Sequence, residues 1–245
     1  MSQFLARPGF RKYFANTSWL LGERILRMGV SLFVGIYVAR YLGPERFGLL
    51  SYSLSFVMLF SSLASFGLDD ILVRELVKRP EQRKNLLGTV FWLKVCGTVV
   101  MGIAIALVLQ FKSEDQQTYW MIGLITIGLL FQTTNVVDFY FQSQVQSKFA
   151  VRAQAFQLLV TSVFKIYLVW NQAELIWFAF ALMLDQVIVA VLFLLVYHWK
   201  IEWFPFFSFT WIQAKKLMRD SWPLIFAGMV VTIYMKIDQV MLKEM

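Results

Sequence analysis

The chain has almost none of the residues that build metal centres and nucleophilic active sites. It contains one cysteine, Cys96, and one histidine, His198. A single cysteine excludes an intramolecular disulfide, and its place inside an apolar segment favours an ordinary packed side chain. One histidine supports neither a histidine-rich zinc site nor Ser-His catalysis. A phosphate-binding loop motif and an Asp-x-Asp motif are also absent from the sequence. We therefore expect no enzyme activity, no cofactor and no metal.

Hydrophobic residues, in contrast, make up 59% of the 245 residues. Soluble domains are nearer 45–50% apolar. Long runs of mostly apolar residues cover 18–41, 49–68, 86–109, 119–141, 153–170, 176–198 and 221–242. Each run has about the length that a helix needs to cross a bilayer, and each is too continuous for a barrel strand. The sequence predicts an all-α integral membrane protein.

The net charge of +8 follows the topology that these segments imply. Of the Lys and Arg residues between the segments, fourteen lie in the N-terminal stretch and in the loops 69–85, 142–152 and 199–220. Two lie in the alternate loops 42–48, 110–118 and 171–175. Cytoplasmic loops of membrane proteins carry such an excess. We expect the N-terminus and the basic loops to be cytoplasmic, and no nucleic acid as a partner.

Four parts are expected along the chain. They are a cytoplasmic segment 1–17, a six-helix bundle 18–198, a cytoplasmic amphipathic linker 199–220, and the first helix of a second bundle, 221–245. Apolar residues at helical spacing among charges also predict an amphipathic interfacial helix after Asp69. The start of the seventh run, Ser221-Trp222, repeats Ser18-Trp19 of the first. This echo is typical of duplicated transporters, and we expect the chain to be the N-terminal part of a longer protein.

Charged residues inside the apolar runs are the candidate functional residues. Such charges are expensive in a bilayer and normally face a cavity or a partner. The bases are Arg24, Arg27, Lys94, Lys165 and Lys236, and the acids are Glu23, Asp138, Asp185 and Asp238. Pairing between Glu23 and Arg27, or between Lys165 and Asp185, is a structural alternative to a binding role. Because bases outnumber acids, a cavity lined by this set suits an anionic phosphate-bearing substrate.

Three segments resemble Wzx-type polysaccharide flippases. They are Tyr37-Val38-Ala39-Arg40-Tyr41-Leu42-Gly43-Pro44-Glu45-Arg46-Phe47-Gly48, then Ser65–Asp69 with Val73–Leu76, and Ser221–Leu224 with Ile233–Leu242. The resemblance implies the two-bundle fold of multidrug and toxin extrusion transporters, of which this chain supplies six helices and the seventh.

The implied activity is transfer of a polyprenyl-pyrophosphate-linked oligosaccharide from the inner to the outer leaflet of the bacterial cytoplasmic membrane, by ion-coupled alternating access, for surface polysaccharides such as O-antigen. Membrane lipid and other polysaccharide-assembly proteins are the implied further partners. On this reading Arg24, Arg27, Lys94, Lys165 and Lys236 bind pyrophosphate, and Asp138, Asp185 or Asp238 couples transport to an ion. A cation or multidrug exporter of the same fold and a membrane-embedded glycan ligase or transferase are the alternatives.

Overall fold

A computed structural model describes residues 8–112 and 115–244. Within these ranges the chain is helical and has no strand; residues 1–7 of the expected N-terminal segment lie outside them. The elements in chain order are α2 (Pro8–Leu59), α3 (Ser61–Ser65), α4 (Asp69–Lys78), η1 (Pro80–Gln82), α5 (Arg83–Gln110), α6 (Gln116–Gln132), η2 (Thr133–Asn135), α7 (Val136–Ser143), α8 (Lys148–Trp170), α9 (Leu175–Lys200) and α10 (Trp211–Glu244).

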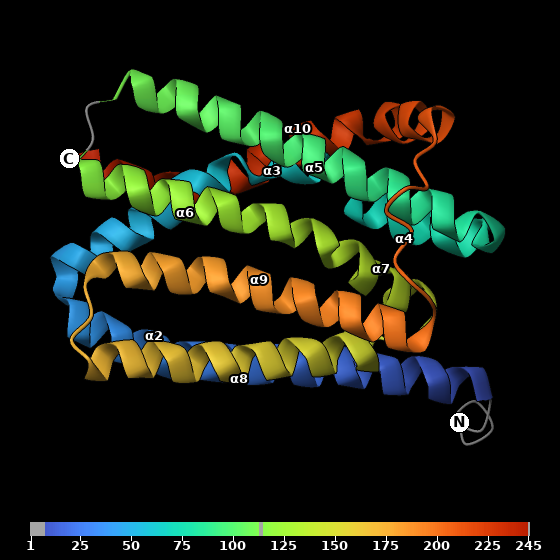
Figure 1. Ribbon diagram of the computed structural model, residues 1–245, viewed down its shortest axis with the longest axis horizontal. Helices are drawn as coiled ribbons and strands as arrows, with labels where there is room; N and C mark the ends of the chain where they lie inside the picture. The colour runs from blue at the N-terminus through green and yellow to red at the C-terminus, as the bar shows by residue number, and fades with distance from the viewer. Residues whose placement is uncertain (1–7, 113–114, 245) are drawn as a thin grey trace.

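The helix α2 consists of two helical stretches joined at Gly43. This residue has φ 72° and ψ 174°, far from helical values. Glycine adopts positive φ at no steric cost, and Pro44 after it lacks the N–H that would continue the hydrogen-bond ladder. Figure 1 shows the chain turning back at this point. The turn separates the expected segments 18–41 and 49–68.

Five stretches of the described residues are helical, long and apolar enough to cross a membrane. They are Asn16–Leu59, which contains the Gly43 turn, Pro80–Gln110, Gln116–Ser143, Lys148–Trp170 and Leu175–Lys200. Four of the five match expected runs, and the first covers two of them. The expected seventh run, 221–242, lies within α10 and is not among the five.

The start of α10 differs from the expected boundary. The residues 201–210 are not helical, whereas α10 begins at Trp211 and continues through Ser221 without a break. The expected linker 199–220 therefore consists of the end of α9, an irregular crossing segment, and the first turns of α10. This crossing segment is fixed to α5, because Trp92 Nε1 donates to the Phe206 carbonyl at 2.7 Å and the Thr210 N–H donates to Thr89 Oγ1 at 3.0 Å.

The amphipathic helix predicted after Asp69 is present as α4. Its apolar face, Ile71, Leu72 and Leu76, is buried in a cluster with α5, α7 and α9. The helix thus packs on the bundle with its apolar side inward. Figure 1 places it at the same end of the molecule as the start of α2, the α7–α8 turn and the α9–α10 crossing.

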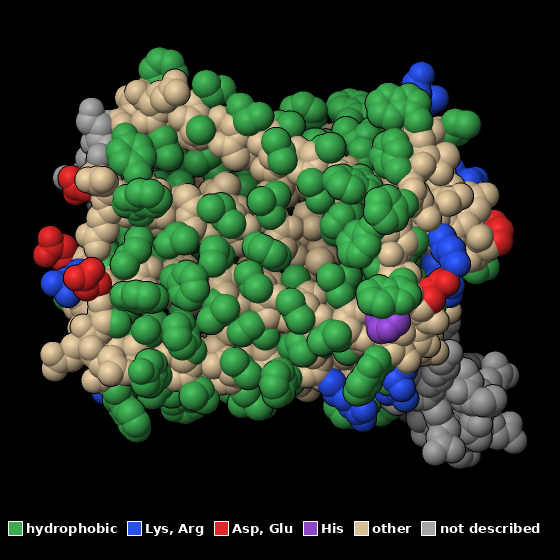
Figure 2. Space-filling view, in the orientation of Figure 1, with side chains coloured by type: hydrophobic (Ala, Val, Ile, Leu, Met, Phe, Trp, Pro, Cys, Tyr) green, Lys and Arg blue, Asp and Glu red, His purple; other side chains and the backbone are tan. Residues whose placement is uncertain are grey.

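The two ends of the bundle differ in charge. Figure 2 shows most of the visible Lys and Arg side chains at the end that carries α4, and a broad band of hydrophobic side chains between the ends. The Gly43 turn and the connections α5–α6 and α8–α9 lie at the opposite end (Figure 1). The alternation that the loop charges predict is therefore present in the arrangement of the helices.

The fourth expected run is interrupted in its second half. A 3-10 turn, η2, separates α6 from α7, and the hydroxyls of Thr133 and Thr134 donate to the carbonyls of Leu130 and Phe131. Threonine hydroxyls compete in this way with the backbone ladder and bend helices. The break turns polar side chains of this region toward α3 and α5.

Candidate functional site

A polar pocket of about 300 Å³ lies between α3, α4, α5, the α6–η2 region and α10. Most of its wall is hydroxyl and amide: Ser61, Ser62, Ser65, Thr98, Gln132, Thr133, Asn135 and Thr232. Ser62 Oγ lies 3.4 Å from Thr232 Oγ1, so α3 and α10 meet at its edge. Hydroxyls and amides both donate and accept hydrogen bonds, and this lining matches the chemistry of a sugar.

One ion pair lies in this pocket. Lys94 of α5 is 5% exposed, and its Nζ is 2.6 Å from Oδ1 of Asp69 at the start of α4. The same ammonium lies 4.9 Å from the ring centroid of Phe139. Lys94 was predicted as a site residue from the sequence, without a named partner. Its partner comes from a different helix, and the pair makes the pocket nearly neutral.

A second polar group joins α2, α7 and α8. Arg27 Nε lies 2.5 Å from Oε1 of Glu23, the ion pair that the sequence analysis left open as the structural alternative. Asp138 interacts electrostatically with both residues and accepts a hydrogen bond from Gln154 Nε2 at 3.5 Å. Gln142, one helical turn further along α7, is a second hydrogen-bonding neighbour of this carboxylate, and its Oδ1 is buried. This group therefore places a buried carboxylate between α2 and α8, with amide neighbours and no paired cation among the described residues.

Lys165 and Asp185 form the third group, between α8 and α9. Lys165 Nζ lies 3.0 Å from Oδ2 of Asp185, and Gln157 Nε2 donates to Oδ1 of the same carboxylate. Gln157 also reaches Thr161 Oγ1 at 3.4 Å. Gln154, Gln157, Thr161 and Lys165 are three or four residues apart and share one face of α8. A polar stripe on α8 thus connects the Asp138 and Asp185 groups.

The remaining predicted site residues lie toward the outside. Arg24 and Asp238 are exposed, and Lys236 is half-buried. No ion pair joins these three to any described residue. Lys236 is one helical turn from Thr232 and therefore on the face of α10 that borders the polar pocket.

The eight predicted site residues thus do not meet in one cavity. Arg27, Asp138, Lys165 and Asp185 lie along the α8 stripe, Lys94 lies in the polar pocket, and Lys236 borders that pocket. Asp69, Gln154 and Gln157 were not predicted as site residues. The period of three and four between 154, 157, 161 and 165 was a signal for the two glutamines, whereas the approach of α4 to α5 had none.

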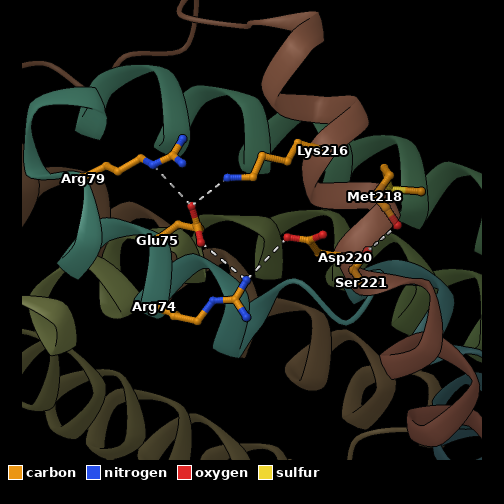
Figure 3. A network of polar contacts seen from close by, with 7 residues as sticks. All are labelled: Arg74, Glu75, Arg79, Lys216, Met218, Asp220 and Ser221. Atoms are coloured by element: carbon orange, nitrogen blue, oxygen red, sulfur yellow. Dashed lines mark hydrogen bonds and ion pairs between the residues drawn. The ribbon is translucent and has the colours of Figure 1, made fainter.

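A further network holds α4 to α10 at the basic end (Figure 3). Glu75, 5% exposed, faces Arg74 Nη2 and Lys216 Nζ, each at 3.4 Å, and Arg79 Nε at 3.9 Å. Arg74 also reaches Asp220 at 3.5 Å. Burial acts to raise the pKa of Glu75, but Lys216 and the two arginines outweigh it and hold the pKa below its ordinary value. The carboxylate is therefore charged at neutral pH and ties α10 to α4.

A second pocket, of about 1050 Å³, lies at the opposite end. It is lined by the Gly43 turn and by the starts of α6 and α9, with Glu45, Asp115 and Glu174 against one Arg46. Acids outnumber bases here, unlike in the rest of the chain. No group of three His, Cys, Asp or Glu residues in the described ranges is arranged to hold a metal ion.

The fold and the buried charges define a class: a multi-pass helical membrane protein with a polar interior. Comparison with known proteins is more specific. The model of the family described as "Polysaccharide biosynthesis protein" matches residues 13–245. The chain therefore belongs to this family, which includes Wzx-type flippases and polysaccharide exporters. No curated protein and no solved structure matches it.

Proposed function

We propose that the protein is a flippase that moves a polyprenyl-pyrophosphate-linked oligosaccharide from the inner to the outer leaflet of the bacterial cytoplasmic membrane, by ion-coupled alternating access. The observation that carries the proposal is the family match over residues 13–245. A pyrophosphate with attached sugars cannot cross hydrocarbon unaided, because its charges and hydroxyls lose their water. The membrane-spanning helices and the polar pocket supply the kind of environment that replaces that water.

The ion pairs suggest how pyrophosphate is received. Arg24 and Lys236 have no acidic partner in the described residues and are available to an incoming phosphate. Lys94 is neutralised by Asp69, so phosphate must displace a carboxylate to reach it. In the proposed cycle the pyrophosphate and Asp69 exchange on Lys94, while the hydroxyls and amides around it accept the first sugar.

Ion coupling is assigned to the α8 stripe. Asp185 is compensated by Lys165, and Asp238 is exposed. Asp138 is the favoured coupling residue, because one of its oxygens is buried and no cation lies within ion-pair distance of it among the described residues. A proton or a sodium ion on Asp138 neutralises that buried charge and changes its interaction with the Glu23–Arg27 pair.

The proposed architecture has six spanning segments followed by a seventh. The Gly43 turn splits α2 into two of these segments, and α10 supplies the last. Its basic end is proposed to face the cytoplasm, on the charge asymmetry of the loops. The acidic pocket at the Gly43 end then opens to the outside. A cation exporter of the same fold is the second candidate, favoured by that acidic lining.

The test is a leaflet-transfer assay with the full-length protein in phosphatidylcholine vesicles. The substrate is a polyprenyl-pyrophosphate-linked oligosaccharide with a fluorophore that an impermeant reductant quenches from outside. We expect the protein to make the inner-leaflet pool accessible, and Lys94→Met to slow this transfer. Vesicles with heat-inactivated protein are the control.

Three results contradict the proposal. Transport of a fluorescent organic cation without movement of the lipid-linked glycan identifies an exporter. Release or transfer of the glycan from its lipid identifies an enzyme. No movement of either substrate by folded protein rejects both transport functions.

A further inference from the structure

A basic and aromatic surface lies where the start of α8 adjoins the end of α9. Lys148 and Arg152 of α8 and Lys200 of α9 are exposed there. Figure 2 shows Lys and Arg side chains gathered at these two helix ends, next to the histidine. We call the surface formed by Lys148, Phe149, Arg152, Lys200 and Trp19 the α8–α9 basic surface. Neither proposed transport role uses it.

An aromatic ring lies next to each of the three cations. The Nζ atoms of Lys148 and Lys200 lie 5.1 Å and 4.9 Å from the centroid of the same ring, Phe149. The guanidinium of Arg152 lies 5.7 Å from the ring of Trp19 on α2. Attraction to a ring face contributes about 0.5–1 kcal/mol at exposed sites. Two ammonium groups that share one ring also repel each other, so the arrangement carries concentrated positive charge.

This charge is not compensated, in contrast to other bases at the same end. No acidic side chain in the described ranges forms an ion pair with Lys148, Arg152 or Lys200. On the α4 side, Glu75, Glu202 and Asp220 are paired with Arg74, Arg79, Arg83, Lys84 and Lys216. The first turn of α8 has no acid either, although helix N-termini favour negative charge. The uncompensated charge of the α8–α9 basic surface therefore favours binding of an anion from outside the described chain.

The surroundings favour a lipid headgroup as the anion. The exposed face of α8 continues from Arg152 through Phe156, Leu159 and Val163, which are 56%, 55% and 67% exposed. These residues follow at spacings of three and four, so charge at the helix end gives way to a strip of apolar side chains on one face. Nearby Trp199 and Trp203 are 86% and 78% exposed, and tryptophan is typical of the headgroup level.

We infer that the α8–α9 basic surface binds an anionic phospholipid, with the phosphate on Lys148, Arg152 and Lys200 and an acyl chain along the apolar face of α8. Basic side chains between helices at one membrane surface bind phospholipid headgroups in this way. A soluble phosphate has no use for the apolar strip. The transported glycolipid is a poorer match, because the polar pocket lies among α3, α4, α5 and α10 and not beside this surface.

The experiment measures lipid retained by the full-length protein. Delipidated protein in neutral detergent is titrated with phosphatidylglycerol or phosphatidylcholine, and bound lipid is counted by native mass spectrometry. Each Lys or Arg near anionic lipid contributes about fivefold in affinity. We expect Lys148→Gln/Arg152→Gln/Lys200→Gln to weaken phosphatidylglycerol binding roughly a hundredfold, and to leave phosphatidylcholine binding unchanged.

The matched control is Lys78→Gln/Lys215→Gln/Arg219→Gln, which removes the same charge from exposed positions on α4 and α10. Equal loss of binding in this control overturns the site, since it shows a general charge effect. Equal retention of both lipids by the wild type also overturns it. Displacement of phosphatidylglycerol by millimolar inorganic phosphate or pyrophosphate identifies a soluble-anion site instead. If the triple variant does not fold, two milder variants are compared. The inference requires phosphatidylglycerol binding to be retained in Lys148→Arg/Lys200→Arg and to fall in Lys200→Gln.

Discussion

Lys94 and Asp69 form an ion pair in which the lysine is buried and the aspartate is half-exposed. Substitution of one residue should therefore change the stability of the fold by a different amount from substitution of the other. The Lys94 side chain is 7% exposed and that of Asp69 is 44% exposed, with 2.6 Å between their charged atoms. Asp69→Asn leaves a buried ammonium without its counter-charge. Lys94→Met removes the buried charge, fills a similar volume and leaves a carboxylate that water still reaches. We expect the first substitution to destabilise the fold far more than the second.

The magnitudes follow from the burial of the group that is left behind. Removal of one partner from a buried ion pair costs about 3–5 kcal/mol, because the other charge stays uncompensated. A half-exposed acid loses only about 0–1 kcal/mol with its partner. Lys94→Met also gives up the contact with Phe139, which contributes about 0.5–1 kcal/mol, but gains apolar packing. At about 2–4 °C per kcal/mol for 150–250 residues, these costs correspond to a decrease in Tm of about 6–20 °C for Asp69→Asn and of a few degrees for Lys94→Met.

The assay is thermal unfolding of the purified variants in one detergent at neutral pH, followed by loss of the monodisperse peak. The double variant Asp69→Asn/Lys94→Met should recover most of the loss, because the buried charge is gone. Equal destabilisation by the two single variants, or no recovery in the double variant, refutes the reasoning. A Lys94→Met protein that is stable but inactive in leaflet transfer assigns Lys94 a role in transport.

Three other predictions concern the framework around the pocket. Glu75 keeps a pKa below its ordinary 4.5, because the cations around it outweigh its burial. Its stabilising contribution is full above pH 4.5 and is lost as the pH falls through the lowered pKa. The gap in Tm between wild type and Glu75→Gln should therefore close on acidification, and a constant gap contradicts this. Cysteines placed singly at Gln82 and Gln213, whose side chains lie 3.0 Å apart, should both resist an impermeant thiol reagent in intact cells, whereas labelling from outside reverses the topology. A Cβ at Gly97 meets a carbonyl of α3 at 2.5 Å, whereas one at Gly102 meets its nearest neighbour at 3.8 Å; Gly97→Ala should therefore lower Tm by several degrees and Gly102→Ala should not, and equal tolerance disproves the close approach of α3 to α5.

Local patterns predicted the helices well and their ends less well. Runs of apolar residues placed α5, α8 and α9 within a few residues, because a membrane helix is a continuous signal of known length. The expected loop 42–48 contains the turn at Gly43. The start expected for the last helix was Ser221, whereas α10 begins ten residues earlier, at Trp211. Its first turns carry Lys215, Lys216 and Arg219, and hydropathy cannot distinguish a charged extension of a membrane helix from a separate amphipathic helix.

The break at η2 escaped prediction for a related reason. Threonine fits an apolar run, and the hydrogen bonds from Thr133 and Thr134 to the preceding carbonyls depend on the local geometry. This short departure from the α-helix nevertheless decides where polar groups of the region point, since Thr133 and Asn135 line the pocket with Lys94. Composition alone therefore predicted a polar interior and did not place it.

The count of charges was the least informative part of the sequence for the site. Five bases against four acids in the apolar runs suggested a surplus of positive charge facing one cavity. In the structure, Glu23, Asp185 and the unforeseen Asp69 each form an ion pair with one of the bases. The bases therefore do not face one cavity as a surplus of positive charge. Partners within one helix can be read from spacing, as with Glu23 and Arg27, whereas partners on different helices depend on tertiary packing.

On the proposed flippase function, the paired charges suit a particular kind of transport cycle. A pocket with permanently free ammonium groups holds pyrophosphate tightly and releases it slowly. When a base can pair with a carboxylate of the same protein, that carboxylate competes with the substrate phosphate for the base. This competition lowers the free-energy difference between the loaded and the empty state. Lys94 with Asp69 has this property, because the acid is half-exposed and can move away without becoming desolvated. Asp69→Asn, where the protein is held folded at low temperature, should accordingly bind pyrophosphate-linked lipid more tightly and transfer it more slowly than wild type; tighter binding with faster transfer contradicts the exchange.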